Sequence, residues 1–352
     1  MSCSSRCLRR RSSRPWREHA GDGVNERAPE EPLAAWVPRL AGRTVLVVGD
    51  AMLDEYLLGR VRRVSPEAPI PVVEIGEKRV TAGGAANVAR NLVALGGRAL
   101  LCGVCGGDEA GRRLRAVLRE EGIDDHLVED PRRPTTLKTR IVAHQQQMLR
   151  VDQEETGSIS GRAARALQAT ALGLLGGADA VVLSDYAKGV VTAGLARAII
   201  AASQETGKPV LVDPKGRDYA KYRGATVVTP NIGEASTAAG RDMNTETTVR
   251  SGMQLLLHRL RADALVVTRG EHGLSLLEAD GAYTHLPTFA REVYDVTGAG
   301  DTALAALALA VAAGASFRTA AALANHAAGV VVAKLGTAIV TPAELLDAVQ
   351  DA

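Results

Sequence analysis

The regular alternation of short apolar runs with longer helical segments is the feature that most constrains the fold of this chain. The first run, Thr44-Val-Leu-Val-Val-Gly49, is apolar and ends at a glycine, as buried strands do. From residue 161 the alternation is continuous, with strands expected at 179–184, 209–213, 225–229 and 263–268 and helices at 161–175, 190–206, 232–239 and 245–260. This pattern predicts an α/β fold with a mostly parallel central sheet and helices on both faces.

Two groups of strands interrupt the alternation. Short strands are expected at 56–63 and 70–75, and again at 136–143 and 147–152. We interpret the segments 56–75 and 136–152 as a small β lid beside the main sheet. No Ser/Gly-rich linker divides the chain, so a single domain is expected over residues 37–352.

Charge and composition exclude several classes of protein. The net charge of +2 hides a basic start, because residues 1–17 carry six arginines and no acid, so the rest of the chain is mildly acidic. With only 3% aromatic residues, a nucleic-acid partner is not expected. No run of about 18 apolar residues occurs, so no membrane span is expected either.

The basic start has no apolar core, which excludes a secretory signal, although its composition also suits a transit peptide. We interpret residues 1–36 as a disordered or artefactual extension. Cys102 and Cys105 have the spacing of a metal or redox pair, but the chain offers no second pair to complete a zinc site. Semi-buried thiols in a reducing cytoplasm fit better.

The most informative motif is Tyr-Asp-Val-Thr-Gly-Ala-Gly-Asp-Thr at residues 294–302, followed by an Ala/Leu-rich helix. The turn Gly298-Ala299-Gly300 therefore lies at a helix N-terminus, where free backbone amides favour an anion. Asp301 lies beside that anion site and could accept a proton from an attacking hydroxyl. It could equally be a helix cap, and spacing alone does not separate the two roles.

Three motifs in order resemble the ribokinase-like (PfkB) carbohydrate kinase family. They are Asp295-Val-Thr-Gly-Ala-Gly-Asp301, Gly83-Gly84-Ala85-Ala86-Asn87 and Asn231-Ile-Gly-Glu234. Four further segments resemble its heptose 7-phosphate kinase branch, which serves ADP-heptose and lipopolysaccharide core biosynthesis: Val48–Asp54, Ser65–Val72, Leu183–Gly189 and Val212–Gly216. The resemblance covers residues 43–350 and implies a ribokinase-like kinase domain, in the form that lacks a fused nucleotidyltransferase.

By this resemblance Asp301 is the catalytic base, and Gly298, Ala299 and Gly300 form the anion hole. The implied reaction is transfer of phosphate from ATP to the anomeric hydroxyl of D-glycero-β-D-manno-heptose 7-phosphate, giving the 1,7-bisphosphate. Positioning and charge neutralisation supply most of the rate of such transfers.

The resemblance also implies a nucleotide side. Asn231 and Glu234 lie one helical turn apart, and Glu234 would organise Mg²⁺ through water. The same pair also fits a helix cap with an acidic first turn. The other implied nucleotide-binding residues are Thr268, Gly270, Gly273 and Asn325. Parts of the family hold a monovalent cation before the base, and the sequence leaves that site open.

On the sugar side, the resemblance assigns the hydroxyl contacts to Asp54, Gly83, Gly84 and Asn87. For Asp50 it leaves open whether the residue joins them or only supports the loop. A phosphorylated sugar also needs cations. Lys138 and Arg140 alternate on one strand and so share a face. With Lys188, they are our candidates for the substrate phosphate, and Arg150 and Lys215 are the next candidates. Lys188 and Lys215 could alternatively neutralise the phosphates of ATP. Each alone could be a solvated surface charge.

The leading hypothesis is a cytoplasmic heptose 7-phosphate kinase that uses ATP and Mg²⁺. The alternatives are another sugar or nucleoside kinase of the same fold, and a non-catalytic sugar-phosphate sensor. The exposed edges of the lid sheet and the family resemblance favour a homodimer that pairs two lids.

Overall fold

The computed structural model describes residues 31–144, 146–289, 293–334 and 336–351. Within them lies a nine-stranded sheet in the order β15-β14-β13-β12-β11-β10-β1-β4-β6, in which only β14 runs antiparallel to its two neighbours. Its strands are β1 (Thr44–Gly49), β4 (Arg98–Cys102), β6 (Asp124–Asp125), β10 (Ala180–Ser184), β11 (Val210–Asp213), β12 (Val227–Val228), β13 (Ala264–Thr268), β14 (Leu274–Glu278) and β15 (Tyr283–Leu286). The predicted α/β class is confirmed.

Helices cover both faces of this sheet because its central strands are apolar on both sides. In β1, Val45 and Val47 pack into one core, whereas Leu46 and Val48 pack into the other. The first core is completed by α1 (Leu33–Trp36), α2 (Ala85–Ala94), α3 (Glu109–Glu120), α8 (Ala299–Ala312), α9 (Phe317–Val332) and α10 (Pro342–Gln350). The second is completed by α4 (Gly161–Leu174), α5 (Ala193–Thr206), α6 (Ile232–Ala239) and α7 (Glu246–Leu260).

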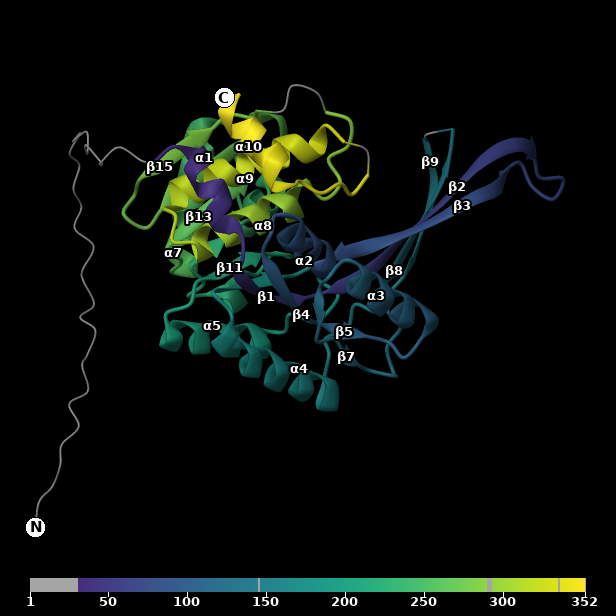
Figure 1. Cartoon of the computed structure of the whole chain (residues 1–352), viewed down its shortest axis with the longest axis horizontal. Coiled ribbons are helices and arrows are strands. Elements are labelled where there is room, and N and C mark those ends of the chain that lie inside the picture. Colours follow the sequence, from purple (N-terminus) through teal and green to yellow (C-terminus); the bar gives the residue numbers. More distant parts are fainter. Residues whose placement is uncertain (1–30, 145, 290–292, 335, 352) are drawn as a thin grey trace, which may run out of the picture. The chain divides into compact units, whose positions relative to one another are not determined.

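A second sheet extends from the helical layers as the lid (Figure 1). It has the order β3-β2-β8-β9, with β2 (Ala51–Val64), β3 (Pro71–Gly84), β8 (Leu137–Ala143) and β9 (Gln146–Gln153). The expected strands 56–63 and 70–75 are too short. β2 and β3 stay paired along their whole length, from Ala51 opposite Gly84 to Val64 opposite Pro71. The lid therefore begins where β1 ends, at Asp50.

The smaller elements connect these layers. They are the strand pair β5 (Val104–Cys105) with β7 (Val128–Glu129), and the 3₁₀ turns η1 (Val37–Leu40), η2 (Leu175–Gly177), η3 (Ala220–Tyr222) and η4 (Gly270–His272). Cys102 and Cys105 are buried free thiols, as expected, and burial raises the pKa of Cys102 to about 12. None of the helices in the described ranges has the length and apolar character to cross a bilayer.

The predicted extension over residues 1–36 lies mostly outside the described residues, which begin at Glu31. Its last part is folded. Leu33 and Trp36 of α1 pack against the first core, so the folded unit begins before the predicted boundary at residue 37.

Candidate active site

The functional side chains gather at the carboxyl ends of the parallel strands. Asp50 follows β1, Asp185 follows β10, Asp213 ends β11 and Thr268 ends β13. The strand order changes direction at β1, which pairs with β4 on one side and β10 on the other. Such a switch point leaves a crevice at the strand ends, where open α/β sheets bind their ligands.

Asp301 lies in the first turn of α8, and the residue is only 7% exposed. Its Oδ1 accepts a hydrogen bond from the Tyr186 hydroxyl at 2.5 Å, and its Oδ2 accepts one from Asn87 Nδ2 at 2.7 Å. The helix N-cap is Gly298, which has no side chain to cap with. Asp301 is thus held by two distant side chains, a geometry that suits a base better than a cap.

The environment of Asp301 tunes its acidity. Burial raises the pKa of this carboxyl to about 6, against the opposing effect of hydrogen bonds from Tyr186 and Asn87. The nearby charge of Asp54 raises this pKa further. A carboxyl with this pKa is mostly ionised at neutral pH yet is a far better proton acceptor than a solvated aspartate, as general-base catalysis requires.

The predicted anion hole begins α8. Gly298 has φ +83°, a conformation that favours glycine, and a Cβ there would lie 3.1 Å from Asn87 Nδ2. A Cβ on Gly300 would meet nothing within 4 Å, and both glycines line the cavity. The amides of Gly298 and Gly300, which have no backbone partner among the described residues, therefore lie beside open space next to Asp301, where the helix dipole favours an anion. The predicted third donor, the Ala299 amide, instead bonds to the Val296 carbonyl at 3.2 Å.

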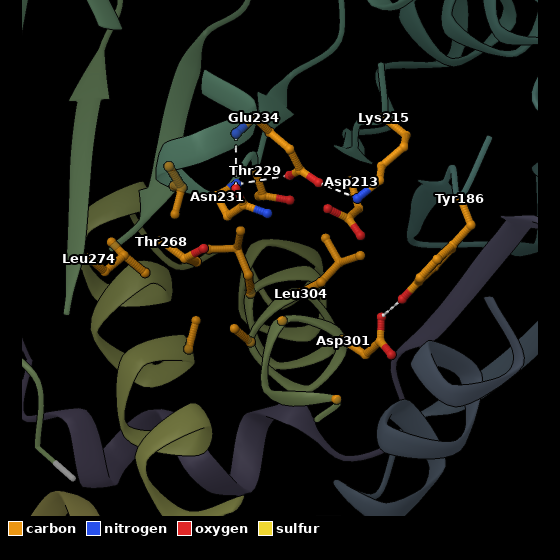
Figure 2. Close-up of a pocket in the computed structure, with 16 residues that line it drawn as sticks. Tyr186, Asp213, Lys215, Thr229, Asn231, Glu234, Thr268, Leu274, Asp301 and Leu304 are labelled. Atoms are coloured by element: carbon orange, nitrogen blue, oxygen red, sulfur yellow. Dashed lines mark hydrogen bonds and ion pairs between the residues drawn. The ribbon is translucent and has the colours of Figure 1, made fainter. Parts of the chain in front are cut away.

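A cavity of about 200 Å³ extends from Asp301 to the start of α6 (Figure 2). Its polar lining comes from Tyr186, Asp213, Lys215, Thr229, Asn231, Glu234, Thr268 and Asp301, and its apolar lining includes Leu274, Leu304 and Ala324. The lining thus combines charged groups with an apolar wall, as sites for small-molecule ligands do.

Asn231 and Glu234 form a capping box at the start of α6. Asn231 Oδ1 accepts from the Glu234 amide at 2.9 Å, and Glu234 Oε2 accepts from the Asn231 amide at 3.1 Å. Glu234 Oε1 accepts from Lys215 Nζ at 2.6 Å. The cap interpretation therefore holds in this structure, while both residues also line the cavity as the nucleotide interpretation requires.

The other expected nucleotide residues are only partly brought together. Thr268 lines the cavity, but Gly270, Gly273 and Asn325 are not among its lining residues. Gly273 shapes the turn after β13, where a Cβ would lie 2.2 Å from a backbone oxygen. Asn325 Nδ2 donates to the Pro287 carbonyl at 2.7 Å, so in this structure it fixes the loop after β15.

On the lid side, Asp54 is buried and accepts a hydrogen bond from Arg140 Nη1 at 2.7 Å. A Cβ on Gly83 would lie 2.6 Å from Asp54 Oδ2, so only glycine leaves room for this carboxylate. Gly84 has φ +56° and turns the chain from β3 into α2. Asn87, expected on the sugar hydroxyls, instead bonds to Asp301 here.

Two of the three predicted phosphate-binding cations, Lys138 and Arg140, share one face of the lid, and Lys188 lies in the loop after β10. Lys138 pairs with Asp54 and Arg140 with Tyr56 in the β2–β8 register, which confirms their common orientation. Each cation already has an acidic partner. Lys138 Nζ contacts Asp152 and Glu154, Lys188 Nζ contacts Glu154, and the next candidate, Arg150, contacts Asp152.

Sequence reasoning missed Tyr186 and Asp213. Tyr186 is positioned by Asp50, whose Oδ2 accepts from the Tyr186 amide at 2.7 Å and from the Lys188 amide at 3.1 Å. Burial, followed by the charges of Asp301 and Glu234, raises the pKa of Asp213 well above its usual value. Both residues lie inside segments that resemble the heptose kinase branch, Leu183–Gly189 and Val212–Gly216. The resemblance therefore marked these positions, but it did not indicate what either side chain does.

Comparison with known proteins identifies the family. Residues 43–344 match the model described as pfkB family carbohydrate kinase. The chain belongs to this family. It is a sugar phosphotransferase, and members of the family use ATP.

Curated relatives of this kinase include the bifunctional protein HldE of Caulobacter vibrioides, 49% identical over 314 residues, and that of Geobacter metallireducens, 48% identical over 306. The matches cover 88% and 86% of this chain but only 64% and 62% of the relatives. The chain thus spans less than two thirds of their length.

Solved structures agree on the fold. A putative ribokinase from Agrobacterium tumefaciens is 25% identical with a TM-score of 0.71, covering 88% of this chain and 98% of its own. Phosphofructokinase-2 from Escherichia coli, in complex with fructose-6-phosphate, is 19% identical with a TM-score of 0.73, covering 88% and 99%. The predicted ribokinase-like fold with a lid is confirmed.

Proposed function

We propose that this kinase transfers phosphate from ATP to the anomeric hydroxyl of D-glycero-β-D-manno-heptose 7-phosphate. The observation that carries the proposal is the position of Asp301, between a cavity suited to a nucleotide and a lid face rich in cations. The choice of sugar rests on the four segments that resemble the heptose kinase branch and on the similarity to HldE proteins. The product would serve ADP-heptose and lipopolysaccharide synthesis.

Each carboxylate oxygen of Asp301 has two lone pairs, so Oδ1 and Oδ2 can each accept another donor besides Tyr186 and Asn87. The anomeric hydroxyl transfers its proton to Asp301 as its oxygen attacks the γ-phosphorus. A new P–O bond forms to the sugar while the bond to the ADP oxygen breaks, and ADP leaves with that electron pair. The amides of Gly298 and Gly300 stabilise charge on the transferring group, and Ala299, whose amide bonds to Val296, shapes the turn between them.

Mg²⁺ fits the residues present only if the nucleotide supplies further ligands. Among the described residues no group of three or more His, Cys, Asp or Glu side chains could hold a metal. Asp213 lines the cavity and has no hydrogen bond or ion pair to another described side chain, whereas Glu234 is engaged by Lys215 and its own cap. We propose Asp213, with Glu234, as the residues that hold Mg²⁺, which neutralises phosphate charge when bound.

The remaining site residues are divided between the nucleotide and the sugar. Thr268 and Asn231 contact the nucleotide, Asp54 and the Gly83-Gly84 turn contact the sugar, and Lys138, Arg140 and Lys188 surround its 7-phosphate. Gly270, Gly273 and Asn325 act by shaping the loops near the nucleotide. A monovalent cation before Asp301 stays a prediction. Phosphofructokinase-2 from Escherichia coli has been solved with potassium.

We further propose a cytoplasmic homodimer. The lid exposes several large apolar side chains, namely Val64, Ile70, Ile75, Met148, Leu149 and Val151. An apolar sheet with open edges is stabilised by pairing with a second copy. Sedimentation of the full chain, compared with a variant that carries Leu149→Lys and Val151→Lys, tests this. A parental chain that sediments as a monomer contradicts it.

The function is tested by measuring ADP release with a panel of acceptors under identical conditions. The panel contains heptose 7-phosphate, free heptose, fructose 6-phosphate, ribose and a nucleoside. We expect kcat/KM to be highest for heptose 7-phosphate. A higher kcat/KM for another acceptor contradicts the substrate assignment. If none of the acceptors is phosphorylated, the result contradicts the proposed kinase reaction and favours a sugar-phosphate sensor.

A further inference from the structure

Glu154 joins two lysines at the lid. It follows β9, and its Oε1 accepts a hydrogen bond from Lys188 Nζ at 2.6 Å while its Oε2 accepts one from Lys138 Nζ at 3.1 Å. The side chains are 22%, 17% and 13% exposed respectively, so the cluster is largely shielded from water. A single carboxylate therefore bridges the two ammonium groups in the way that a phosphate would.

This cluster lies close to the base. Lys188 and Tyr186 are two residues apart, so their Cα atoms are at most about 7 Å apart, and the Tyr186 hydroxyl contacts Asp301. Lys138 lies directly opposite Asp54 in the lid, and the charge of Asp54 reaches Asp301 strongly enough to raise its pKa. The two lysines are thus on the lid side of the reacting centre, away from the nucleotide cavity.

A bound phosphate dianion and Glu154 cannot share these lysines. Lys138 also donates to Asp152 Oδ2 at 2.9 Å, so a phosphate added to the cluster would meet two carboxylates at close range. Like charges at such distances in a partly buried site are strongly unfavourable. Either phosphate binds elsewhere or the Glu154 carboxylate moves away.

The geometry favours movement of the side chain alone. Arg133 donates hydrogen bonds to the carbonyls of Glu155 and Gly157, the latter at 2.9 Å, and so fixes the backbone that follows Glu154. Among the described residues, Glu154 itself is held through its carboxylate by the two lysines alone. A rotation of its side chain would free both ammonium groups without rearranging the loop.

We propose that Glu154 is a built-in competitor for a phosphomonoester dianion, which takes its place between Lys138 and Lys188. The identity of the sugar that carries this phosphate rests on the proposed function. Glu154 weakens phosphate binding, keeps the lysines neutralised when the site is empty of substrate, and replaces the phosphate when product leaves. A neutral sugar cannot displace it, because it offers the lysines no charge in exchange.

The test uses inorganic phosphate as the probe, titrated into the full chain by calorimetry with Mg²⁺ and ADP present to occupy the nucleotide side. We expect Glu154→Gln to bind phosphate about tenfold more tightly or better, since a neutral amide competes far less for the lysines. The matched control is Glu155→Gln, which removes the same charge from an exposed neighbour whose side chain accepts a hydrogen bond from the Gly157 amide and has no cationic partner among the described residues. Unchanged or weaker binding by Glu154→Gln overturns the proposal.

A double variant shows whether the tighter phosphate binding depends on Lys188. Adding Lys188→Met to Glu154→Gln should abolish the tighter binding, and a gain that survives overturns the proposal because the phosphate then binds elsewhere. In turnover, Glu154→Gln should lower the KM for heptose 7-phosphate by the same factor as the phosphate dissociation constant. If no heptose phosphate is a substrate, the proposed function fails, while the phosphate titration still decides the role of Glu154.

Discussion

The Tyr186 hydroxyl donates a hydrogen bond of 2.5 Å to Oδ1 of Asp301 across 115 positions of sequence. The tyrosine is placed by Asp50, a buried carboxylate at the end of β1 whose oxygens accept the amides of Tyr186, Lys188 and Val190. One loop therefore carries both a partner of the base and a cation of the lid cluster. The shape of this loop depends on Asp50, which holds the backbone of both residues but has no hydrogen bond to either side chain.

Tyr186→Phe should move the acid limb of the pH profile of kcat/KM to higher pH. As the proposed base, Asp301 has to be ionised, so we expect activity to fall as pH drops through its pKa of about 6. The Tyr186 hydrogen bond lowers that pKa, and its loss raises it. A hydrogen bond of about 1 kcal/mol predicts a shift of up to about one pH unit. A profile that scales down without shifting would indicate a purely structural role for Tyr186.

Asp301→Asn should reduce kcat by about 10²–10⁴-fold, the usual cost of losing a positioned general base. Asparagine keeps the size of the side chain and can still accept one hydrogen bond from Tyr186 or Asn87, so the fold and ATP binding should persist. Single-turnover kinetics and calorimetric titration with ATP measure the two effects. Near-parental kcat in the folded variant would return Asp301 to a structural role in α8.

Gly83→Ala should impair sugar binding rather than stability of the core. The added Cβ would lie 2.6 Å from Asp54 Oδ2, so the carboxylate that pairs with Arg140 has to move. We expect KM for the sugar to rise about tenfold or more, with little change in KM for ATP. Gly76→Ala is the control, since a Cβ at this lid position meets only one atom, at 4.0 Å. Equal effects on the two substrates would argue against a sugar contact.

Local patterns in the sequence predict the elements and the first turn of α8 well. The alternation of Lys138 and Arg140 on one face follows from the period of a strand alone. The partners of these residues could not be predicted, because Asp54 lies 86 positions from Arg140 and meets it only through the parallel pairing of β2 with β8. The bond of Asn87 to Asp301 could not be predicted for the same reason, since it spans 214 positions.

The lid strands show a second limit of local reasoning. Their inner ends carry small residues such as Ala82, Gly83 and Gly84, which have low strand propensity and shortened the predicted elements. Register with residues 51–53 of β2 keeps them extended. Asp213 was missed for a different reason, because a carboxylate that ends a strand is common and its isolation depends on the surrounding fold.

Asp213→Asn should raise the Mg²⁺ concentration needed for half-maximal activity by about tenfold or more. Burial, Asp301 and Glu234 all raise the pKa of Asp213, so its ionised form is unfavourable unless a cation is near. Lys215 opposes this rise, but its ammonium bonds to Glu234. A divalent ion brought in with the nucleotide would supply the missing positive charge, and an amide would retain it far less well. Activity is measured against Mg²⁺ at fixed ATP, with Asp218→Asn, an exposed residue on the following turn, as the control. An unchanged Mg²⁺ requirement together with reduced kcat would assign Asp213 to charge balance around Asp301 and leave the metal to Glu234 and the phosphates.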